Sequence, residues 1–269
     1  MFAKRIVLAA IVGLGALAGS AFAREGVKIG NPSFVRKLVS AAKIENAAAL
    51  QYDDLTRKAF QKQALVDPGD PMARRVRKIT DALLPFTAAF NDRAPDWKWE
   101  VNLIRSSQIN AFCMPGGKIA LFTGIIEKLA LSDDEIAMVV GHEIAHALRE
   151  HARERAAKST LTNVGALAVG VIVGGNVGEL ARVGGGLMTL KFSRDDETEA
   201  DLIGMELSAR AGYDPRAGIT LWEKMSQASR GAPPQWLSTH PSGKTRITTI
   251  EKNLPDVMPL FERARSQRG

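Results

Sequence analysis

Three histidines and two glutamates lie within eleven residues, in the stretch GHEIAHALREH from 141 to 151, although the whole chain has only four histidines. His142 and His146 are four residues apart, so on a helix they project from one face, about 40° apart. Two imidazoles supply neutral nitrogen ligands for zinc, and Glu143 beside them can accept a proton from water that the metal activates. This H-E-x-x-H pattern predicts a zinc-dependent hydrolytic site. Two ordinary helix histidines are the alternative.

The helix that must position these residues has a clear start signal. Ser132 is the predicted N-cap and Glu135 the third helical residue, which together form a capping box. The pattern then runs without proline to about Ala157, which predicts one unbroken helix. In such a helix His151 lies about 140° from His146 and cannot share a metal with it. We therefore expect His151 on the polar face of the helix.

A second set of acidic residues lies in FSRDDETEADLIGMELSARAGYDP, from 192 to 215. The pattern predicts a helix that stops near Gly212, with Glu197 and Asp201 four residues apart on one side. This spacing suits zinc, because one carboxylate can bind the metal while the other, one turn on, orients a ligand histidine. The alternative is an acidic helix start that only complements the helix dipole.

Other elements must support these two helices. The stretch DPGDP, 67–71, predicts a turn and a helix start, with Asp70 as N-cap and Pro71 at the first helical position. Alternating apolar residues in WKWEVNL, 97–103, predict a half-buried strand. INAFCMPGGKIALFTG, 109–124, predicts two short strands around a Pro-Gly-Gly turn.

The first residues have the pattern of a secretory signal peptide. Lys4 and Arg5 precede an apolar stretch that ends near Gly19, and small residues lie where signal peptidase cuts, which predicts cleavage after Ala23. The apolar stretch is shorter than the roughly 20 residues that a membrane span needs, so a retained anchor is the less favoured alternative. No cysteine follows to suggest a lipid anchor. We therefore expect an exported protein.

Removal of residues 1–23 leaves 246 of the 269 residues, and loss of Lys4 and Arg5 lowers the formal net charge from +7 to +5. The scattered cations can favour an anionic surface or simply form a solvated face, and we expect no nucleic-acid partner. Cys113 is the only cysteine, so no internal disulfide can form, and a buried thiol is expected.

Three motifs in order resemble the HtpX/Oma1-type zinc metallopeptidases. This gluzincin family includes the CAAX prenyl proteases and periplasmic proteases of the BepA and LoiP kind. The motifs are HEIAH, ETEAD followed by Gly204, and STHPSGKTRI at 238–247, and together they span about residues 75–250. The resemblance implies an α+β, mainly helical zincin-like fold with a small β-sheet beside the HExxH helix. It also implies one Zn²⁺ per chain.

The resemblance assigns roles to individual residues. It makes His142, His146 and Glu197 the zinc ligands, Glu143 the general base and Asp201 the residue that orients a ligand.

Further roles come from the other matched motifs. His240 matches a histidine that can be a fourth, removable zinc ligand or can help to stabilise the oxyanion, and packing in a turn is its structural alternative. Arg246 matches the family arginine, and the resemblance places it with the catalytic residues. Asn110 and Ala111 match the edge strand that pairs with an extended substrate, where an ordinary buried hairpin is the alternative.

The segment 159–178, STLTNVGALAVGVIVGGNVG, lies between the two predicted metal-binding helices and has no charge. Its strongly apolar part is about half the length of a membrane span. We favour a mobile helical hairpin or flap over the active site. Contact with a membrane surface or with outer-membrane assembly, and a plain core helix, are the alternatives.

We predict four regions: a signal peptide (1–23), an N-terminal helical extension (24–70), the metallopeptidase domain (71–255) and a C-terminal tail (256–269). The expected function is a zinc-dependent endopeptidase that removes misfolded or misassembled proteins, bound as extended strands. The resemblance and the signal place it in a bacterial periplasm. A catalytically silent zincin-fold chaperone or assembly factor is the alternative. The substrate, its cleavage preference and the oligomeric state do not follow from the sequence.

Overall fold

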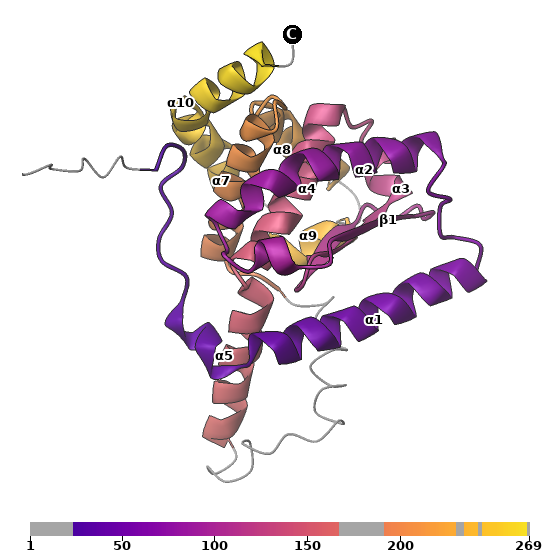
Figure 1. Cartoon of the computed structure of the whole chain (residues 1–269), viewed down its shortest axis with the longest axis vertical. Helices are drawn as coiled ribbons and strands as arrows, with labels where there is room; N and C mark the ends of the chain where they lie inside the picture. Colours follow the sequence, from indigo (N-terminus) through magenta and orange to yellow (C-terminus); the bar gives the residue numbers. More distant parts are fainter. Residues whose placement is uncertain (1–23, 167–190, 230–233, 242–243, 268–269) are drawn as a thin grey trace, which may run out of the picture.

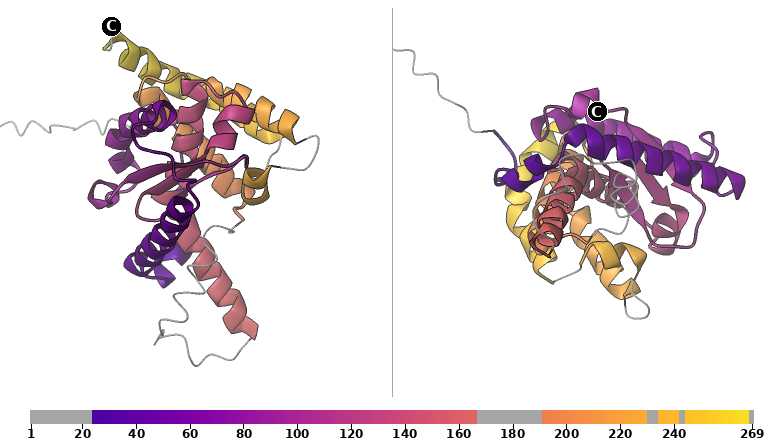
Figure 2. Two further views of the ribbon diagram at one scale, coloured as in Figure 1. Left: turned by 90° about the vertical axis from the view of Figure 1, so that its right-hand side faces the viewer. Right: turned by 90° about the horizontal axis from the view of Figure 1, so that it is seen from below.

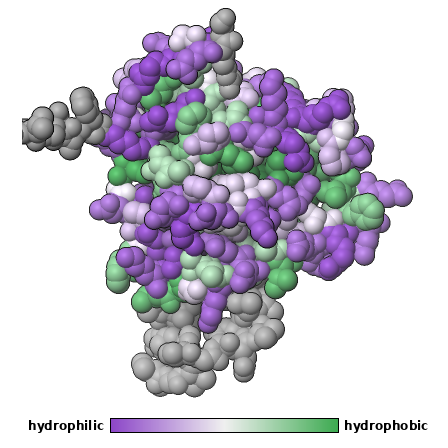
Figure 3. Space-filling view, viewed as in Figure 1, coloured by the Kyte–Doolittle hydropathy of each residue, from purple (hydrophilic) through white to green (hydrophobic). Residues whose placement is uncertain are grey.

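The computed structural model describes residues 24–166, 191–229, 234–241 and 244–267. Within these ranges the fold is mainly helical with one small mixed sheet, which confirms the predicted fold class (Figure 1). Among the helices of these ranges, none is long and apolar enough to cross a membrane. Hydrophilic side chains cover most of the face seen in Figure 3, with hydrophobic ones between them.

The sheet has three strands in the order β1-β3-β2 in the described chain. β3 (Lys118–Phe122) lies in the middle, parallel to β1 (Glu100–Ile104) and antiparallel to β2 (Ala111–Met114). The predicted Pro-Gly-Gly turn joins β2 to β3, and Gly116 and Gly117 adopt φ of 83° and 81°, which glycine adopts without strain. β1 starts at Glu100, three residues later than its alternation predicted. β2 is therefore an edge strand of the described sheet.

Helix α4 (Asp133–Leu148) is the centre of the domain, and every residue from Glu135 to Leu148 is buried. Helices pack around it on several sides (Figures 1 and 2). The other helical segments are η1 (Phe34–Leu38), α1 (Ala41–Gln61), α2 (Pro71–Leu83), η2 (Leu84–Ala89), η3 (Ala94–Asp96), α3 (Thr123–Lys128), α5 (His151–Ala166), α7 (Arg194–Arg210), α8 (Ala217–Ala228), α9 (Gln235–Thr239) and α10 (Lys244–Ser266).

The long helix α1 lies beside the sheet, below it in Figure 1. Its Tyr52 is fully buried, and the phenol hydroxyl donates a hydrogen bond to the Ile119 carbonyl oxygen of β3 at 2.5 Å. The predicted N-terminal helical extension (24–70) contains two separate helical segments, η1 and α1.

The start signals read from the sequence are present in the structure. Asp70 caps α2 by accepting from the Met72 backbone N–H at 2.8 Å. At α4, the Glu135 N–H donates to Ser132 Oγ at 3.2 Å, and the Ser132 N–H donates back to Glu135 Oε2 at 2.8 Å. Local side-chain chemistry therefore fixes where the central helix begins.

Glu135 also joins α4 to α8, and this contact makes stability depend on pH. Burial alone would raise the pKa of Glu135, but the hydrogen bond from Lys224, with those from Ser132 and Thr220, lowers it below the ordinary value of 4.5. A lowered folded-state pKa means that the stabilisation is fully present above the unfolded-state pKa. It is lost as pH falls through the folded-state value.

The variant Glu135→Gln is therefore expected to lower the free energy of unfolding at pH 7 by about 1–2 kcal/mol. The difference from wild type should shrink below about pH 4, where the wild-type carboxylate also becomes protonated. Urea unfolding at several pH values, with chelator present throughout, measures both. A difference that stays constant down to pH 3 would contradict this account.

Helices α4 and α7 cross at two glycines with their backbones in contact. A Cβ atom added to Gly204 would lie 2.7 Å from the His142 backbone nitrogen, and one added to Gly141 would lie 2.8 Å from the Gly204 carbonyl oxygen. Cβ atoms in real proteins essentially never lie this close to other heavy atoms. The glycines therefore allow α7 to bring its acidic residues next to the histidines of α4.

The prediction of one unbroken helix to Ala157 is wrong. α4 ends at Leu148, Glu150 adopts a left-handed φ of 57°, and α5 begins at His151. The Glu150 carboxylate is held by arginines from three other segments: it accepts from Arg36 at 2.7 Å, from Arg93 at 2.6 Å and from Arg153 at 2.9 Å. These contacts stabilise an unfavourable backbone conformation and so bend the chain between α4 and α5.

The expected C-terminal tail is helical as far as Ser266, because residues 256–266 continue α10. Val257, Leu260 and Phe261 of this stretch are buried in the hydrophobic core. In the segment 159–178, the backbone up to Ala166 continues α5, and the remainder lies outside the described residues. The flap and the domain boundaries stay predictions.

Candidate metal centre

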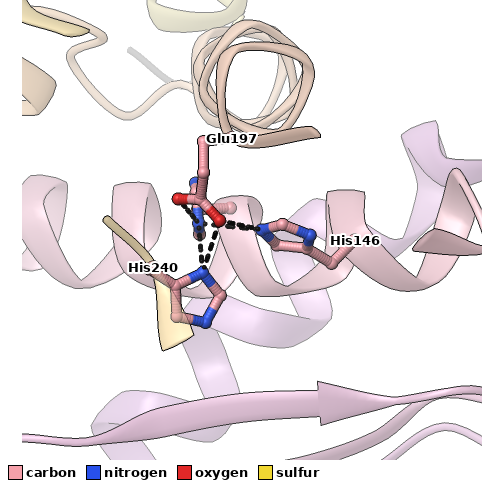
Figure 4. Close-up of side chains that lie close together, drawn as sticks. His146, Glu197 and His240 are labelled. Carbon is pink, nitrogen blue, oxygen red and sulfur yellow. Dashed lines mark hydrogen bonds and ion pairs between the residues drawn. The ribbon is translucent and has the colours of Figure 1, made fainter. Parts of the chain in front are cut away.

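Four buried side chains from two helices and the end of α9 converge at one point. His142 and His146 come from α4, Glu197 from α7 and His240 from the C-terminal end of α9. One potential ligand atom from each residue lies within 4.8 Å of those of the other three. Figure 4 shows Glu197 pointing from α7 toward His146 and His240. The structure thus brings together the three predicted zinc ligands and the predicted fourth one.

The ligand atoms lie at spacings close to those of a tetrahedral zinc site, with the two distances to Glu197 ending at different oxygens. Zinc–ligand distances of 2.0–2.2 Å place tetrahedral ligand atoms about 3.3–3.5 Å apart. His142 Nε2 lies 3.1 Å from His146 Nε2 and 3.6 Å from Glu197 Oε2. His146 Nε2 lies 3.4 Å from Glu197 Oε1, and His240 Nδ1 lies 3.2 Å from His142 Nε2. Three imidazole nitrogens and one carboxylate form a donor set that zinc favours.

The ring nitrogen of His142 that points away from the ligand cluster faces the Asp201 carboxylate, in agreement with the predicted role of Asp201 in orienting a ligand. His142 Nδ1 lies 3.1 Å from Asp201 Oδ1. Burial alone would raise the pKa of Asp201, but the adjacent Arg246 charge lowers it, so the carboxyl group is ionised. An ionised Asp201 keeps the proton of His142 on Nδ1 and leaves Nε2 free to bind metal.

Arg246 contacts the ligands Glu197 and His142 and does not line the cleft that reaches Glu143 and His146. Its guanidinium donates to both Asp201 oxygens, at 2.6 and 2.5 Å, and also bonds Glu197. Its outer side stacks on the Trp222 ring, with the guanidinium carbon 3.7 Å from the ring centroid. Through these contacts Arg246 positions the carboxylates of Asp201 and Glu197.

His146 and Glu197 are in the protonation states that zinc binding needs. Burial lowers the pKa of His146 well below its usual range, so the imidazole is neutral. Burial by itself would raise the pKa of Glu197, but hydrogen bonds from His146 and His240 lower it well below its usual range. A neutral imidazole and an ionised carboxylate are both competent ligands.

The expected position of His151 on a polar face is wrong. The side chain is buried, with 3% of its surface exposed, because the bend at Glu150 turns it toward the metal centre. A regular helix would have directed it about 140° away from His146. The local sequence could not reveal this, since the bend depends on distant arginines.

Glu143 has a partner that the sequence analysis missed. Its Oε1 accepts a hydrogen bond from the Trp236 indole Nε1–H at 2.6 Å and lies 3.6 Å from His240 Nε2. Trp236 is fully buried and stacks on His240, with ring centroids 5.1 Å apart. The one signal in the sequence was an aromatic residue four positions before the T-H-P histidine. The predicted general base is therefore held by the same short helix that contributes His240.

A cleft leads to Glu143 and His146 along the edge strand. It is lined by the segment 110–115, which includes the predicted substrate-strand residues Asn110 and Ala111, and by Phe192, Gln235, Thr239 and His240. Ala111 is nearly fully buried, and its N–H is bonded to Asn110 Oδ1 at 3.0 Å. The edge strand and the metal centre thus face one shared cleft, while binding of a substrate strand stays a prediction.

Phe192 is a second residue of this cleft that the sequence analysis did not find. Its ring centroid lies 4.1 Å from that of His146 and 5.3 Å from that of His240. The Phe192 N–H donates to the Thr239 carbonyl oxygen at 3.1 Å. Phe192 therefore covers the metal ligands from the side of the cleft.

Comparison with known proteins agrees with this geometry. The model of "Peptidase family M48" matches residues 72–254. The chain is 40% identical over 218 residues to "Mitochondrial metalloendopeptidase OMA1" of Schizosaccharomyces pombe, covering 78% of this chain and 64% of that protein. It is 42% identical over 149 residues to the Arabidopsis thaliana protein of that name, covering 55% and 30%.

A bacterial relative is also similar. "Beta-barrel assembly-enhancing protease" of Escherichia coli is 29% identical over 172 residues, covering 59% of this chain and 35% of that protein. The chain thus spans less than two thirds of the length of each of these three relatives.

Proposed function

Because this chain belongs to peptidase family M48, we propose that it is a zinc-dependent endopeptidase, with zinc held by His142, His146 and Glu197. The observation that carries the proposal is the convergence of these ligands beside Glu143, at the end of a cleft bordered by an edge strand. A carboxylate in reach of the metal centre is needed for hydrolysis but not for holding the metal.

The chain's own residues divide the chemistry between them. Zinc, when bound, supplies a Lewis acid that polarises a carbonyl group and makes water acidic. Glu143 accepts the proton of the attacking water at its carboxylate and can deliver it to the leaving amine. β2 binds the substrate in extended form through its free edge, which aligns the scissile bond with Glu143. Asp201 and Arg246 hold the ligands in place.

We assign His240 to a resting state of the enzyme. Catalytic zinc sites keep one position open for water or substrate, whereas four protein ligands close the site. His240 Nδ1 lies 3.0 Å from Glu197 Oε1, inside the ligand cluster, so it has the place of a fourth ligand. It must leave before the substrate enters.

The cellular role extends this proposal. The signal-like residues 1–23 and the similarity to "Beta-barrel assembly-enhancing protease" support a site of action in a bacterial envelope, with misfolded or misassembled proteins as substrates. Contact of the segment 159–178 with a membrane surface or assembly machinery belongs to the same proposal.

Zinc content and casein cleavage of the purified chain test the proposed function. We expect one zinc per chain, cleavage that stops on chelation and recovery after zinc is added back. His240→Ala should keep zinc and cleave several-fold faster, because the variant exposes the fourth position. Slower cleavage by that variant would instead favour an oxyanion role for His240. Zinc without cleavage in either form would support the silent chaperone, and absence of zinc would overturn the site.

A further inference from the structure

His146 meets the ligand cluster with one ring nitrogen, and its other nitrogen faces His151. His146 Nδ1 lies 2.9 Å from His151 Nδ1, and both rings are 3% exposed. The far nitrogen of His151, Nε2, lies 3.2 Å from Glu199 Oε2. No described carboxylate contacts His146 Nδ1, in contrast to His142, whose Nδ1 lies next to Asp201.

The proton positions on His146 and His151 follow from counting the hydrogen-bond donors and acceptors between His146, His151 and Glu199. When His146 Nε2 binds zinc, that nitrogen carries no proton, so the single proton of the neutral imidazole lies on Nδ1. His151 Nδ1 must then be the acceptor, which places the proton of His151 on Nε2. This N–H donates to Glu199, a carboxylate that only accepts. Each assignment fixes the next, and one arrangement satisfies all three groups.

Glu199 is in turn held in one orientation. Arg149 donates to both of its oxygens at 2.8 Å, a two-point contact that fixes the plane of the carboxylate. Arg149 is 4% exposed, and it also donates to the Gly30 carbonyl oxygen at 2.6 Å. The series of contacts from His146 through His151 therefore ends on the Glu199 carboxylate, which cannot rotate freely.

The bend between α4 and α5 makes this arrangement possible. Glu150, in its left-handed conformation, turns His151 back toward His146, and Arg36, Arg93 and Arg153 hold Glu150 in that conformation. The contact is thus built by tertiary structure rather than by helical spacing.

We propose that His151 and Glu199 form a relay that positions His146 for zinc, with Glu199 fixing the tautomer of His151 and His151 fixing the tautomer and ring orientation of His146. His151 and Glu199 are positioning residues that act through His146. The proposal rests on the zinc site of the proposed function. Partners that accept the outer N–H of a metal-binding histidine commonly change metal affinity by about 10–100-fold when they are removed.

Two variants of similar shape at His151 test the relay by zinc affinity, measured in competition with a chromophoric chelator. His151→Asn places an amide oxygen near the position of Nδ1 and keeps an acceptor, whereas His151→Leu has nearly the same shape and none. We expect His151→Leu to weaken zinc binding about 10–100-fold and His151→Asn to keep most of the wild-type affinity. Unfolding in the presence of chelator shows whether both metal-free forms are equally folded.

A second pair keeps the test decisive if His151→Leu does not fold. Glu199→Gln should weaken zinc binding, while Asp195→Asn, which removes a charge from an exposed residue in the first turn of the same helix, should not. Where His151→Leu does fold, the loss in the double variant of His151→Leu and Glu199→Gln should be smaller than the two single losses combined.

The results separate the relay from the zinc site itself. Wild-type affinity in His151→Leu, or equal weakening by Asn and Leu, would overturn the relay while leaving the zinc site intact. If Leu does not fold, equal affinities of Glu199→Gln and Asp195→Asn would do the same. Failure of the wild type to bind zinc would overturn the proposed function and the relay together.

Discussion

Glu143→Gln is expected to bind zinc as tightly as wild type and to lose proteolytic activity by at least about 10²–10⁴-fold. The amide cannot accept the proton of the attacking water, but it has the shape of the carboxylate. It can still accept the hydrogen bond from Trp236, whose indole nitrogen lies 2.6 Å from Glu143 Oε1. The fold and the ligand cluster should therefore be unchanged.

Zinc content, unfolding in urea and the rate of casein cleavage measure these three properties separately. Glu127→Gln is a matched control, because it is the same substitution at an exposed residue of α3 and should leave all three at wild-type values. Substantial cleavage by a zinc-loaded Glu143→Gln protein would show that another group accepts the proton.

The second large effect is expected from Gly204→Ala at the crossing of α4 and α7. Two terms oppose each other, because alanine favours a helix by about 1 kcal/mol over glycine while the added Cβ meets backbone atoms of Gly141 and His142. Backbone atoms cannot rotate away, so the steric term should dominate. We expect a net loss of about 1–3 kcal/mol in the free energy of unfolding, with a larger loss for Gly204→Val.

The same substitution should weaken zinc binding, because any separation of the two helices moves Glu197 away from His142 and His146. Zinc affinity and unfolding of metal-free protein measure the two effects. Gly30→Ala offers a control, since a Cβ atom there has no neighbour within 4 Å. Unchanged stability and zinc affinity in Gly204→Ala would mean that the crossing is not tightly constrained.

Features set by local chemistry could be predicted from the sequence. The capping residues Asp70 and Ser132, the Pro-Gly-Gly turn and the i, i+4 pair of Glu197 and Asp201 each depend on residues within about one helical turn. The structure has all of them where the sequence placed them. The position of His240 in the cluster followed from the resemblance and not from spacing.

Features set by contacts between distant segments could not be predicted. The end of α4 depends on the ion pairs of Glu150 with Arg36 and Arg93, which are 114 and 57 residues away. The bond between Trp236 and Glu143 spans 93 residues. Periodicity reports which face of a helix is apolar, and it contains no information about such pairs.

The short helix α9 makes three contacts that bear on the proposed resting state. Trp236 bonds Glu143, His240 lies among the zinc ligands, and the Trp236 N–H donates to the Ile109 carbonyl oxygen, two residues before β2 begins, at 3.1 Å. Displacement of this one helix would free the base, a coordination position and a backbone acceptor next to the edge strand in a single event. If proteolysis needs all three, as the proposed function implies, a partial displacement of α9 would leave at least one component unavailable, and activity would stay low until α9 has fully moved.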